Sequence, residues 1–364
     1  MTNLPTPEQE IQVLPKAQKK NRKWIILVGL FFLLLTLFLA YLLLARTSNK
    51  PSGFISQPVL TPTPLPFEEI TIPYLRQQEY KSTLGDLEKV SENASYTSYL
   101  TSYTSNGLKI NGLLTIPKGP PPEGGFPAIV FVHGYIAPSI YRTLERYVDH
   151  VDYLARNGFV VFKIDLRGHG SSEGSPGGGY FGSDYVTDAL NARAALGASD
   201  FVDPKAIGFW GHSMAGNILM RSFAAKPDIP AVVIWAGAVY SYVDRDKYGI
   251  NDNSYRPPGM SSGLQNRRQR LFEKYGSPSA ESVFWQQVAP TNYLNDLKGA
   301  LQIHHAIDDS VVNIGYSRDL IALLDETSVP HELWEYPSGG HNITGISFAQ
   351  AMKRTVEFYK KYLK

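Results

Sequence analysis

Residues 206–216 read AIGFWGHSMAG, and this stretch decides the fold. The apolar run Ala206–Trp210 predicts a buried β-strand, and the residues that follow the stretch favour a helix. The chain must therefore turn sharply from strand to helix at Ser213. Small residues two positions before and two after the serine, Gly211 and Ala215, let the two backbones pass closely. The turn would present the serine hydroxyl at a helix N-terminus, where backbone N–H groups favour negative charge.

This spacing matches the nucleophile elbow G-x-S-x-G, with Ala215 in place of the last glycine. The predicted strand before the motif and the predicted helix after it supply the context that the motif requires. We therefore expect Ser213 to be a nucleophile. The alternative is a serine that only shapes a tight turn.

A serine hydroxyl becomes a good nucleophile when a neighbouring base takes its proton. The best candidate for that base is His341, which stands alone in the loop Ser338–Asn342 after the last predicted strand. His133, His169 and His212 lie in tight segments beside predicted strands and look structural. An unremarkable loop histidine is the alternative for His341.

A carboxylate must orient the imidazole and stabilise its charged form. Asp308 and Asp309 follow a predicted strand, and the chain order serine, aspartate, histidine is the one expected of α/β-hydrolases. Both aspartates remain candidates on this basis. A metal site made of His304, His305 and the two aspartates is an alternative, but adjacent residues of a strand point to opposite faces. No metal or cofactor is required for the predicted chemistry.

Acyl transfer also needs two hydrogen-bond donors for the developing oxyanion. The backbone N–H of Met214, which follows the nucleophile, is one predicted donor. The backbone N–H of Tyr135, in the loop after the strand that ends at His133-Gly134, is the other.

From about residue 97 onward, short apolar runs alternate with helical patterns. Asn106-Gly107 predicts a hairpin between the runs 96–102 and 108–116. Further strands are predicted at 128–134, 159–164, 206–210, 231–235, 301–304 and 332–336, with helices at 144–157, 184–196, 217–225, 315–324 and 346–362. This alternation indicates an α/β fold with a mostly parallel sheet and helices on both faces. Residues 241–290 interrupt it and predict a cap insertion at the edge where ligands bind; a surface excursion without a role is the alternative.

The N-terminal part predicts a membrane anchor. Residues 24–45 carry no charged side chain, and a helix of this length would span about 33 Å, enough to cross a hydrocarbon core of about 30 Å. The basic leader 1–23 favours a cytoplasmic N-terminus. We expect a single-pass protein of the cell membrane, with a Pro/Thr-rich stalk at 46–66 and a catalytic domain at 67–364 outside the cytoplasm. A cleaved signal peptide is the alternative.

The chain of 364 residues has no cysteine, which excludes disulfides, thiolate nucleophiles and cysteine-bound metals. The formal net charge is +2, and part of the basic excess lies in the leader, so nucleic-acid binding has little electrostatic support. The expected partners are a peptide or ester substrate and, through the anchor, the membrane. Sequence leaves the oligomeric state open.

From residue 97 to the C-terminus, the chain resembles the catalytic domain of the prolyl oligopeptidase family within the α/β-hydrolase superfamily. The resemblance rests on the segments SNGLKINGLLTIP, FPAIVFVHGY, VVFKIDLRGHGSSEG, VDPKAIGFWGHSMAG, APTNYLNDLKGALQIHHAIDDSVV and YPSGGHNI. The family pattern HGxxDxxVP implies that Asp308, rather than Asp309, is the catalytic carboxylate. Two departures, His305 for glycine and Val312 for proline, are expected to touch no catalytic atom.

The resemblance implies a serine peptidase. No stretch of the chain could encode the β-propeller of the large family members, and no acidic pair for gripping a substrate N-terminus is evident. A carboxylesterase is therefore an alternative. A non-catalytic binding protein that keeps the hydrolase scaffold is a second one.

Overall fold

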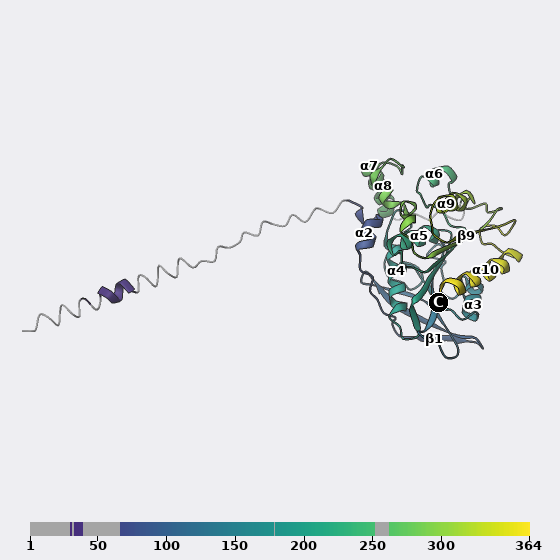
Figure 1. Ribbon diagram of the computed structural model, residues 1–364, viewed down its shortest axis with the longest axis horizontal. Helices are drawn as coiled ribbons and strands as arrows, with labels where there is room; N and C mark the ends of the chain where they lie inside the picture. Colours follow the sequence, from purple (N-terminus) through teal and green to yellow (C-terminus); the bar gives the residue numbers. More distant parts are fainter. Residues whose placement is uncertain (1–29, 31–32, 39–65, 178, 252–261) are drawn as a thin grey trace, which may run out of the picture. The chain divides into compact units, whose positions relative to one another are not determined.

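Figure 1 shows the computed structural model, which describes residue 30 and residues 33–38, 66–177, 179–251 and 262–364. The chain divides into two units, residues 1–63 and 64–364. In the first unit, the described residues are helical. The predicted leader, most of the predicted anchor and all but the last residue of the predicted stalk lie outside the described residues. Within the described ranges, no helix is long and apolar enough to cross a membrane.

The second unit is built on one sheet, which has nine strands within the described residues. The strands are β1 (Glu88–Glu92), β2 (Tyr96–Ser105), β3 (Leu108–Pro117), β4 (Phe126–Val132), β5 (Val160–Ile164), β6 (Val202–His212), β7 (Ala231–Trp235), β8 (Ala300–Ala306) and β9 (His331–Tyr336). Their order is β1-β2-β3-β5-β4-β6-β7-β8-β9. The pairs from β1 to β5 are antiparallel, and those from β5 through β4 to β9 are parallel. The predicted, mostly parallel sheet is confirmed.

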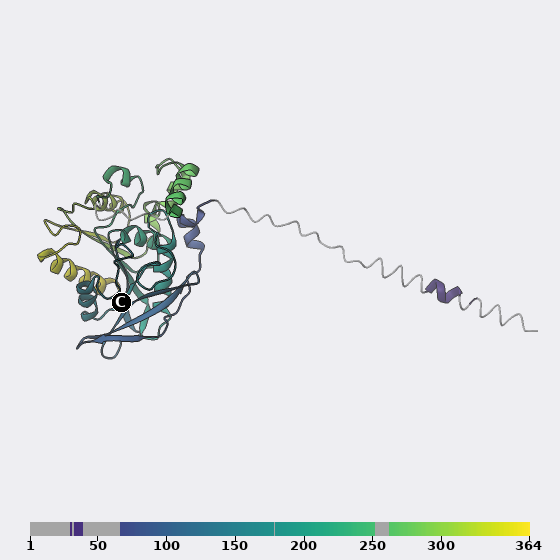
Figure 2. The same cartoon turned by 180° about the vertical axis from the view of Figure 1, so that it is seen from behind.

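Helices cover both faces of this sheet (Figures 1 and 2). The helices α3 (Val148–Arg156) and α10 (Ile346–Tyr362) pack on one face, and α4 (Asp184–Gly197), α5 (Ala215–Ala225) and α9 (Gly315–Asp325) pack on the other. The remaining helices are η1 (Glu68–Ile70), α2 (Ile72–Gln77), α6 (Asp244–Tyr248), α7 (Ser262–Tyr275), α8 (Val283–Val288) and η2 (Pro290–Asp296).

The strand β4 shows why its sequence is apolar at every position. Ala128, Val130 and Val132 point into the core beneath α4 and α5. Ile129 and Phe131 point into the core beneath α3 and α10. Because successive side chains of a strand face opposite sides, a strand covered on both faces needs a continuous apolar run.

The predicted hairpin is also confirmed. β2 and β3 pair from Tyr96 with Pro117 to Ser105 with Leu108. The two turn residues, Asn106 and Gly107, have φ values of 49° and 78°. Both positive values are what a tight two-residue turn between twisted strands requires, and asparagine and glycine adopt them most easily.

Some elements of the unit were not predicted, among them β1 and the helices within residues 241–290. Every residue of β1 is exposed, so the strand carries no apolar alternation that would indicate it. Residues 241–290 contain α6, α7 and α8, which gather near the top of the view in Figure 1. The sequences of α6 and α7 are mostly polar and α8 is only six residues long, so hydrophobic periodicity does not indicate these helices.

Candidate active site

The serine turn joins β6 to α5. Ser213 has a φ of 58°, a backbone conformation that residues with side chains rarely adopt. Its backbone N–H donates to the carbonyl of Trp235 on β7 over 2.9 Å. A methyl group added to Gly211 would lie 2.7 Å from a methyl of Leu219 and 2.8 Å from that of Ala215. Glycine is therefore required at position 211, whereas alanine is accommodated at 215.

Ser213 is joined by hydrogen bonds to two residues at the same edge of the sheet, His341 and, through it, Asp309. His341 Nε2 lies 2.9 Å from Ser213 Oγ, and His341 Nδ1 lies 2.8 Å from Asp309 Oδ2. The three residues follow β6, β9 and β8 respectively, so the carboxyl ends of three parallel strands bring them together. The Asp309 side chain is fully buried and that of His341 is 16% exposed. The imidazole can take the hydroxyl proton while the carboxylate holds the opposite ring nitrogen.

The prediction of Asp308 as the third member is wrong in this geometry. Asp308 is exposed, and its two carboxylate oxygens accept hydrogen bonds from the backbone N–H groups of Gly339 and Gly340, at 3.2 and 2.8 Å. It braces the loop that carries His341 but does not contact the imidazole. Asp309 is turned inward instead, and its carboxylate reaches the ring.

Asp309 is held in place by its own neighbours. Its Oδ1 accepts the backbone N–H groups of Val311 and Val312 at 2.8 and 3.0 Å. Burial opposes its ionisation, but hydrogen bonds with His305 and His341 outweigh burial and hold the pKa of this carboxyl well below its usual range. The carboxylate is therefore ionised at neutral pH.

The expectation that His305 and Val312 touch no catalytic atom is wrong once Asp309 is the carboxylate. His305 Nε2 lies 3.2 Å from Asp309 Oδ2 and 3.0 Å from the carbonyl of Val312. Both of these partners accept, so Nε2 carries the proton, and Nδ1 accepts from the Ser317 hydroxyl at 2.7 Å. Asp309 Oδ2 is thus within hydrogen-bond distance of two imidazole rings, those of His305 and His341.

His212, set aside as structural from the sequence, links three parts of the site. Its Nε2 lies 2.8 Å from the carbonyl of His341 and must donate to it. Its Nδ1 then accepts from the Tyr147 hydroxyl at 2.9 Å, and that hydroxyl accepts the N–H of Gly134 at 3.0 Å. Burial, together with the positive charge that His341 can carry, lowers the pKa of His212 to about 3, so its ring stays neutral. This relay fixes the loop of His341 relative to the serine turn.

The predicted oxyanion donors are Met214, directly after Ser213, and Tyr135, in the loop after β4. Met214 is the N-cap of α5, where backbone N–H groups have no acceptor within the helix. Tyr135 follows Gly134 in the loop after β4, and Gly134 is tied to the serine turn through Tyr147 and His212. Both residues are thus close in the fold to Ser213.

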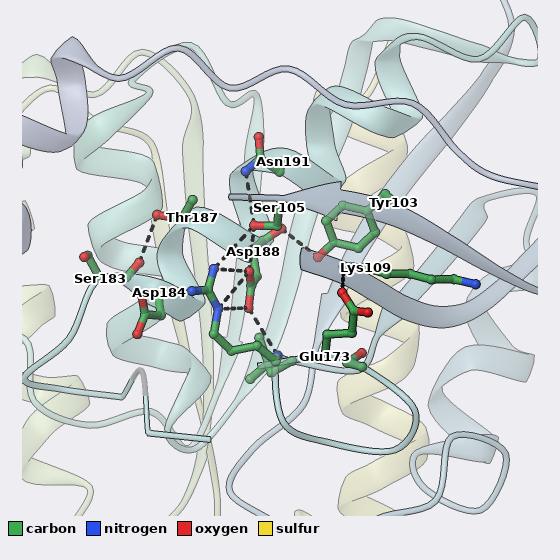
Figure 3. Close-up of polar contacts among 12 residues, drawn as sticks. Tyr103, Ser105, Lys109, Glu173, Ser183, Asp184, Thr187, Asp188 and Asn191 are labelled. Atoms are coloured by element: carbon green, nitrogen blue, oxygen red, sulfur yellow. Dashed lines mark hydrogen bonds and ion pairs between the residues drawn. The ribbon is translucent and has the colours of Figure 1, made fainter. Parts of the chain in front are cut away.

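A buried ion pair fixes another loop beside the serine. The Arg167 guanidinium bonds to the buried Asp188 carboxylate at 2.6 Å and to Asp184 at 3.0 Å. Ser105 and Asn191 complete the network, which joins β2 to α4 (Figure 3). We call residues 168–177 and 179–183, which run from Arg167 to α4, the entry loop.

The entry loop reaches the serine turn. A methyl group added to Gly179 would lie 3.5 Å from the Met214 sulfur. The carbonyl of Tyr180 accepts a hydrogen bond from the Tyr242 hydroxyl at 2.7 Å, which ties the loop to the segment before α6. The ion pair of Arg167 therefore anchors a loop that lies against Met214, the residue after Ser213.

His304 faces away from this site. Its ring bonds to Tyr336, Gln302 and Thr355 on the face beneath α10, opposite to the ring of His305. Within the described ranges, no group of three or more histidines and carboxylates could hold a metal ion.

Comparisons with known proteins agree with this fold. Residues 126–251, which include Ser213 but end before Asp309 and His341, match the family described as "Serine aminopeptidase, S33". The uncharacterized peptidase YtmA of Bacillus subtilis is 24% identical over 247 residues, covering 67% of this chain and 85% of that protein.

Two solved structures share the architecture. An acetyl xylan esterase from a Paenibacillus species has a TM-score of 0.57 at 18% identity, over 80% of this chain and 92% of that one. The dipeptidyl peptidase 4 of Porphyromonas gingivalis has a TM-score of 0.57 at 20% identity, over 74% of this chain and 36% of that one. The chain therefore has an α/β-hydrolase fold, as predicted, and is similar to both peptidases and esterases. The narrower resemblance to prolyl oligopeptidases stays a prediction.

Proposed function

We propose that this protein is a serine hydrolase that cleaves amide or ester bonds through an acyl-enzyme. The observation that carries the proposal is the series Ser213 Oγ, His341 and Asp309, joined by hydrogen bonds of 2.9 and 2.8 Å. The strained φ of Ser213 supports it, because such backbone conformations persist mainly where function needs them.

In the proposed reaction, Ser213 Oγ attacks the substrate carbonyl carbon while His341 Nε2 takes the hydroxyl proton. Asp309 stabilises the imidazolium that forms. His341 then gives the proton to the leaving amine or alcohol, and the acyl group stays on Ser213. A water molecule, deprotonated by His341, attacks the acyl carbon, and the serine leaves with its proton restored.

The N–H groups of Met214 and Tyr135 are the proposed oxyanion donors. Each such donor is worth about 10²–10³ in kcat in other acyl transferases. No cofactor takes part in this scheme.

Peptide hydrolysis is the first candidate activity, in line with the family match at residues 126–251 and the similarity to a peptidase. Ester hydrolysis is the second. It is favoured by a cluster of aromatic rings in which Phe181 of the entry loop, Phe272 of α7 and Trp285 of α8 pack at centroid distances of 5.4 to 6.3 Å. With α6–α8 acting as a cap, these rings would favour an apolar acyl or alcohol group.

The proposed setting is the outer face of the cell membrane. It rests on the uncharged stretch at 24–45 and the basic residues before it. Protease treatment of intact cells tests this: digestion of an epitope at the C-terminus but not at the N-terminus supports the orientation, and protection of both ends contradicts it.

The activity is tested with the full chain and its Ser213→Ala variant. We would measure kcat/KM on peptide p-nitroanilides and p-nitrophenyl esters. The variant should lose about 10⁶ in kcat if the three residues act as a unit. Serine-dependent anilide cleavage would establish a peptidase, and ester turnover alone would favour the esterase. Equal rates for the variant and the wild type on both substrate classes would leave only a non-catalytic hydrolase-like protein.

A further inference from the structure

Two arginines approach one aromatic ring of the entry loop. The guanidinium carbon of Arg268 on α7 lies 5.0 Å from the centroid of the Phe181 ring, and that of Arg245 on α6 lies 5.6 Å from it. The three side chains come from three separate segments, and all three are half-buried. Phe181 also packs against Tyr242, Phe272 and Trp285.

Neither guanidinium has a carboxylate partner among the residues that the structure describes. The Arg245 Nε–H is buried and has no acceptor in that part of the chain. By contrast, Arg267, the neighbour of Arg268 on α7, pairs with Glu69. Asp246 is near enough to act on Arg268 through space, but the two form no ion pair.

This arrangement is electrostatically unfavourable as it stands. Burial and the positive charge of Arg245 both lower the pKa of the Arg268 guanidinium. A buried donor without an acceptor also costs free energy, and the ring of Phe181 compensates each cation only in part. An anion bound between the two guanidinium groups would remove both penalties.

Arg245 and Arg268 lie near the edge of the sheet that carries the serine turn. Phe181 is two residues from Gly179, which lies against Met214. Arg245 belongs to the segment that follows the carboxyl end of β7, the strand beside β6 and Ser213. The Tyr242 hydroxyl joins that segment to the entry loop. The two arginines thus approach a ring of the loop that lies against Met214, the residue after Ser213, which makes them candidates to contact the far end of a bound substrate.

We infer that Arg245, Arg268 and Phe181 form a substrate subsite that binds a carboxylate group. A planar guanidinium can donate two parallel hydrogen bonds to a carboxylate. Two guanidinium groups beside a cluster of aromatic rings therefore suit a ligand with a carboxylate at the end of an apolar chain. The inference rests on the proposed hydrolase function and narrows its substrate class to compounds with an acidic group remote from the scissile bond.

The test compares matched neutral and acidic substrates. For the full chain, we would measure kcat/KM on p-nitrophenyl esters of straight-chain monocarboxylic acids and on half-esters of dicarboxylic acids, over a series of increasing chain length. A parallel series places a carboxylate on the phenol instead of the acyl group. The readout is the ratio of acidic to neutral kcat/KM at each length.

The variants are Arg245→Gln and Arg268→Gln, with Arg270→Gln as the matched control. Arg270 is an exposed residue of α7, so this control removes the same charge from the same helix. We expect each test variant to lower the ratio by about tenfold at the best chain length, the effect of one charge-assisted contact. The control should leave the ratio unchanged, and added salt should lower the wild-type ratio.

Rates on the neutral ester report the folded, active fraction of every variant, so misfolding cannot imitate the result. A ratio that stays the same in both test variants, at every length and in both series, would overturn the subsite while the hydrolase function stands. Absence of serine-dependent turnover of the neutral esters by the wild type would overturn the hydrolase function, and the subsite with it.

Discussion

Replacing Asp309 or Asp308 by asparagine tests which of the two carboxylates is catalytic, because the change removes the charge and hardly alters the shape of the side chain. In the structure, Asp309 Oδ1 accepts two backbone N–H groups, and Oδ2 faces His341 Nδ1. An asparagine at 309 would keep its side-chain carbonyl oxygen near the N–H groups of Val311 and Val312. The reverse orientation would place the NH₂ group of the asparagine against these two N–H donors. In the favoured orientation, the NH₂ group would point at His341 Nδ1.

That orientation forces the wrong tautomer. With a donor facing it, Nδ1 must accept, so the ring proton moves to Nε2, which can no longer take the proton of Ser213. In other serine enzymes the same replacement lowers kcat by about 10⁴ with the geometry intact. We expect a loss of this order for Asp309→Asn.

Asp308→Asn should act far more weakly. It replaces one of two exposed hydrogen bonds to the loop of Gly339 and Gly340, at 3.2 and 2.8 Å. A bond of this kind is worth about 1 kcal/mol, so the loss should stay within about tenfold. The assay is kcat/KM on p-nitrophenyl butyrate, with thermal unfolding and near-ultraviolet circular dichroism as folding controls. A larger loss for Asp308→Asn than for Asp309→Asn would refute the assignment.

Four further predictions concern the support of the site and the pH dependence of folding. Tyr147→Phe removes the hydroxyl that joins Gly134 to His212. It should lower the free energy of unfolding by about 2 kcal/mol and kcat/KM by about tenfold. A change in stability alone would show that this hydrogen-bond relay does not position His341. Asp188→Asn leaves the buried Arg167 guanidinium without a charged partner at position 188 and should lower the free energy of unfolding in urea by about 3 kcal/mol. A loss below about 1 kcal/mol would contradict the role of this ion pair. Gly211→Ala should destabilise by about 1–3 kcal/mol because its methyl meets Leu219, and an unchanged melting temperature would argue against the close approach. His150 lies on α3, and burial lowers its pKa to about 3, so below about pH 6.5 the unfolded chain binds a proton that the folded chain does not. Stability should therefore fall as the pH is lowered from about 6.5, and His150→Phe should reduce that slope by up to about 1.4 kcal/mol per pH unit. An equal slope in both proteins would count against this role of His150.

The serine and the histidine of the site could be predicted because their signals are local. The strand, the tight turn and the helix around Ser213 occupy one short stretch of sequence, and His341 is isolated in a loop after a strand. The mostly parallel sheet with helices on both faces followed from the alternation of strands and helices. These features need no knowledge of distant contacts.

The aspartate could not be predicted because the sequence repeats itself there. His304-His305 and Asp308-Asp309 allow two registers of the pattern HGxxDxxVP, one residue apart. If His305 and Ala306 take the places of histidine and glycine, then Asp309 is the aspartate and Asn313 stands at the proline. The burial of Asp309, and not its spacing, distinguishes the two registers.

The relay through His212 and the arginine pair depends on contacts between distant parts of the chain. His212 meets Tyr147 and His341, which lie 65 and 129 residues away in the sequence. Arg245 and Arg268 belong to helices of irregular period, and their shared ring lies on the entry loop. No pattern within one segment indicates such contacts.

The proposed function requires that Ser213 is a nucleophile activated by His341. The most direct measurement treats the full chain with a fluorophosphonate and identifies the modified residue by peptide mass spectrometry. We expect a single adduct on Ser213, absent from Ser213→Ala and strongly slowed in His341→Gln. An adduct that persists in Ser213→Ala, or no reaction of the folded wild type, would contradict it.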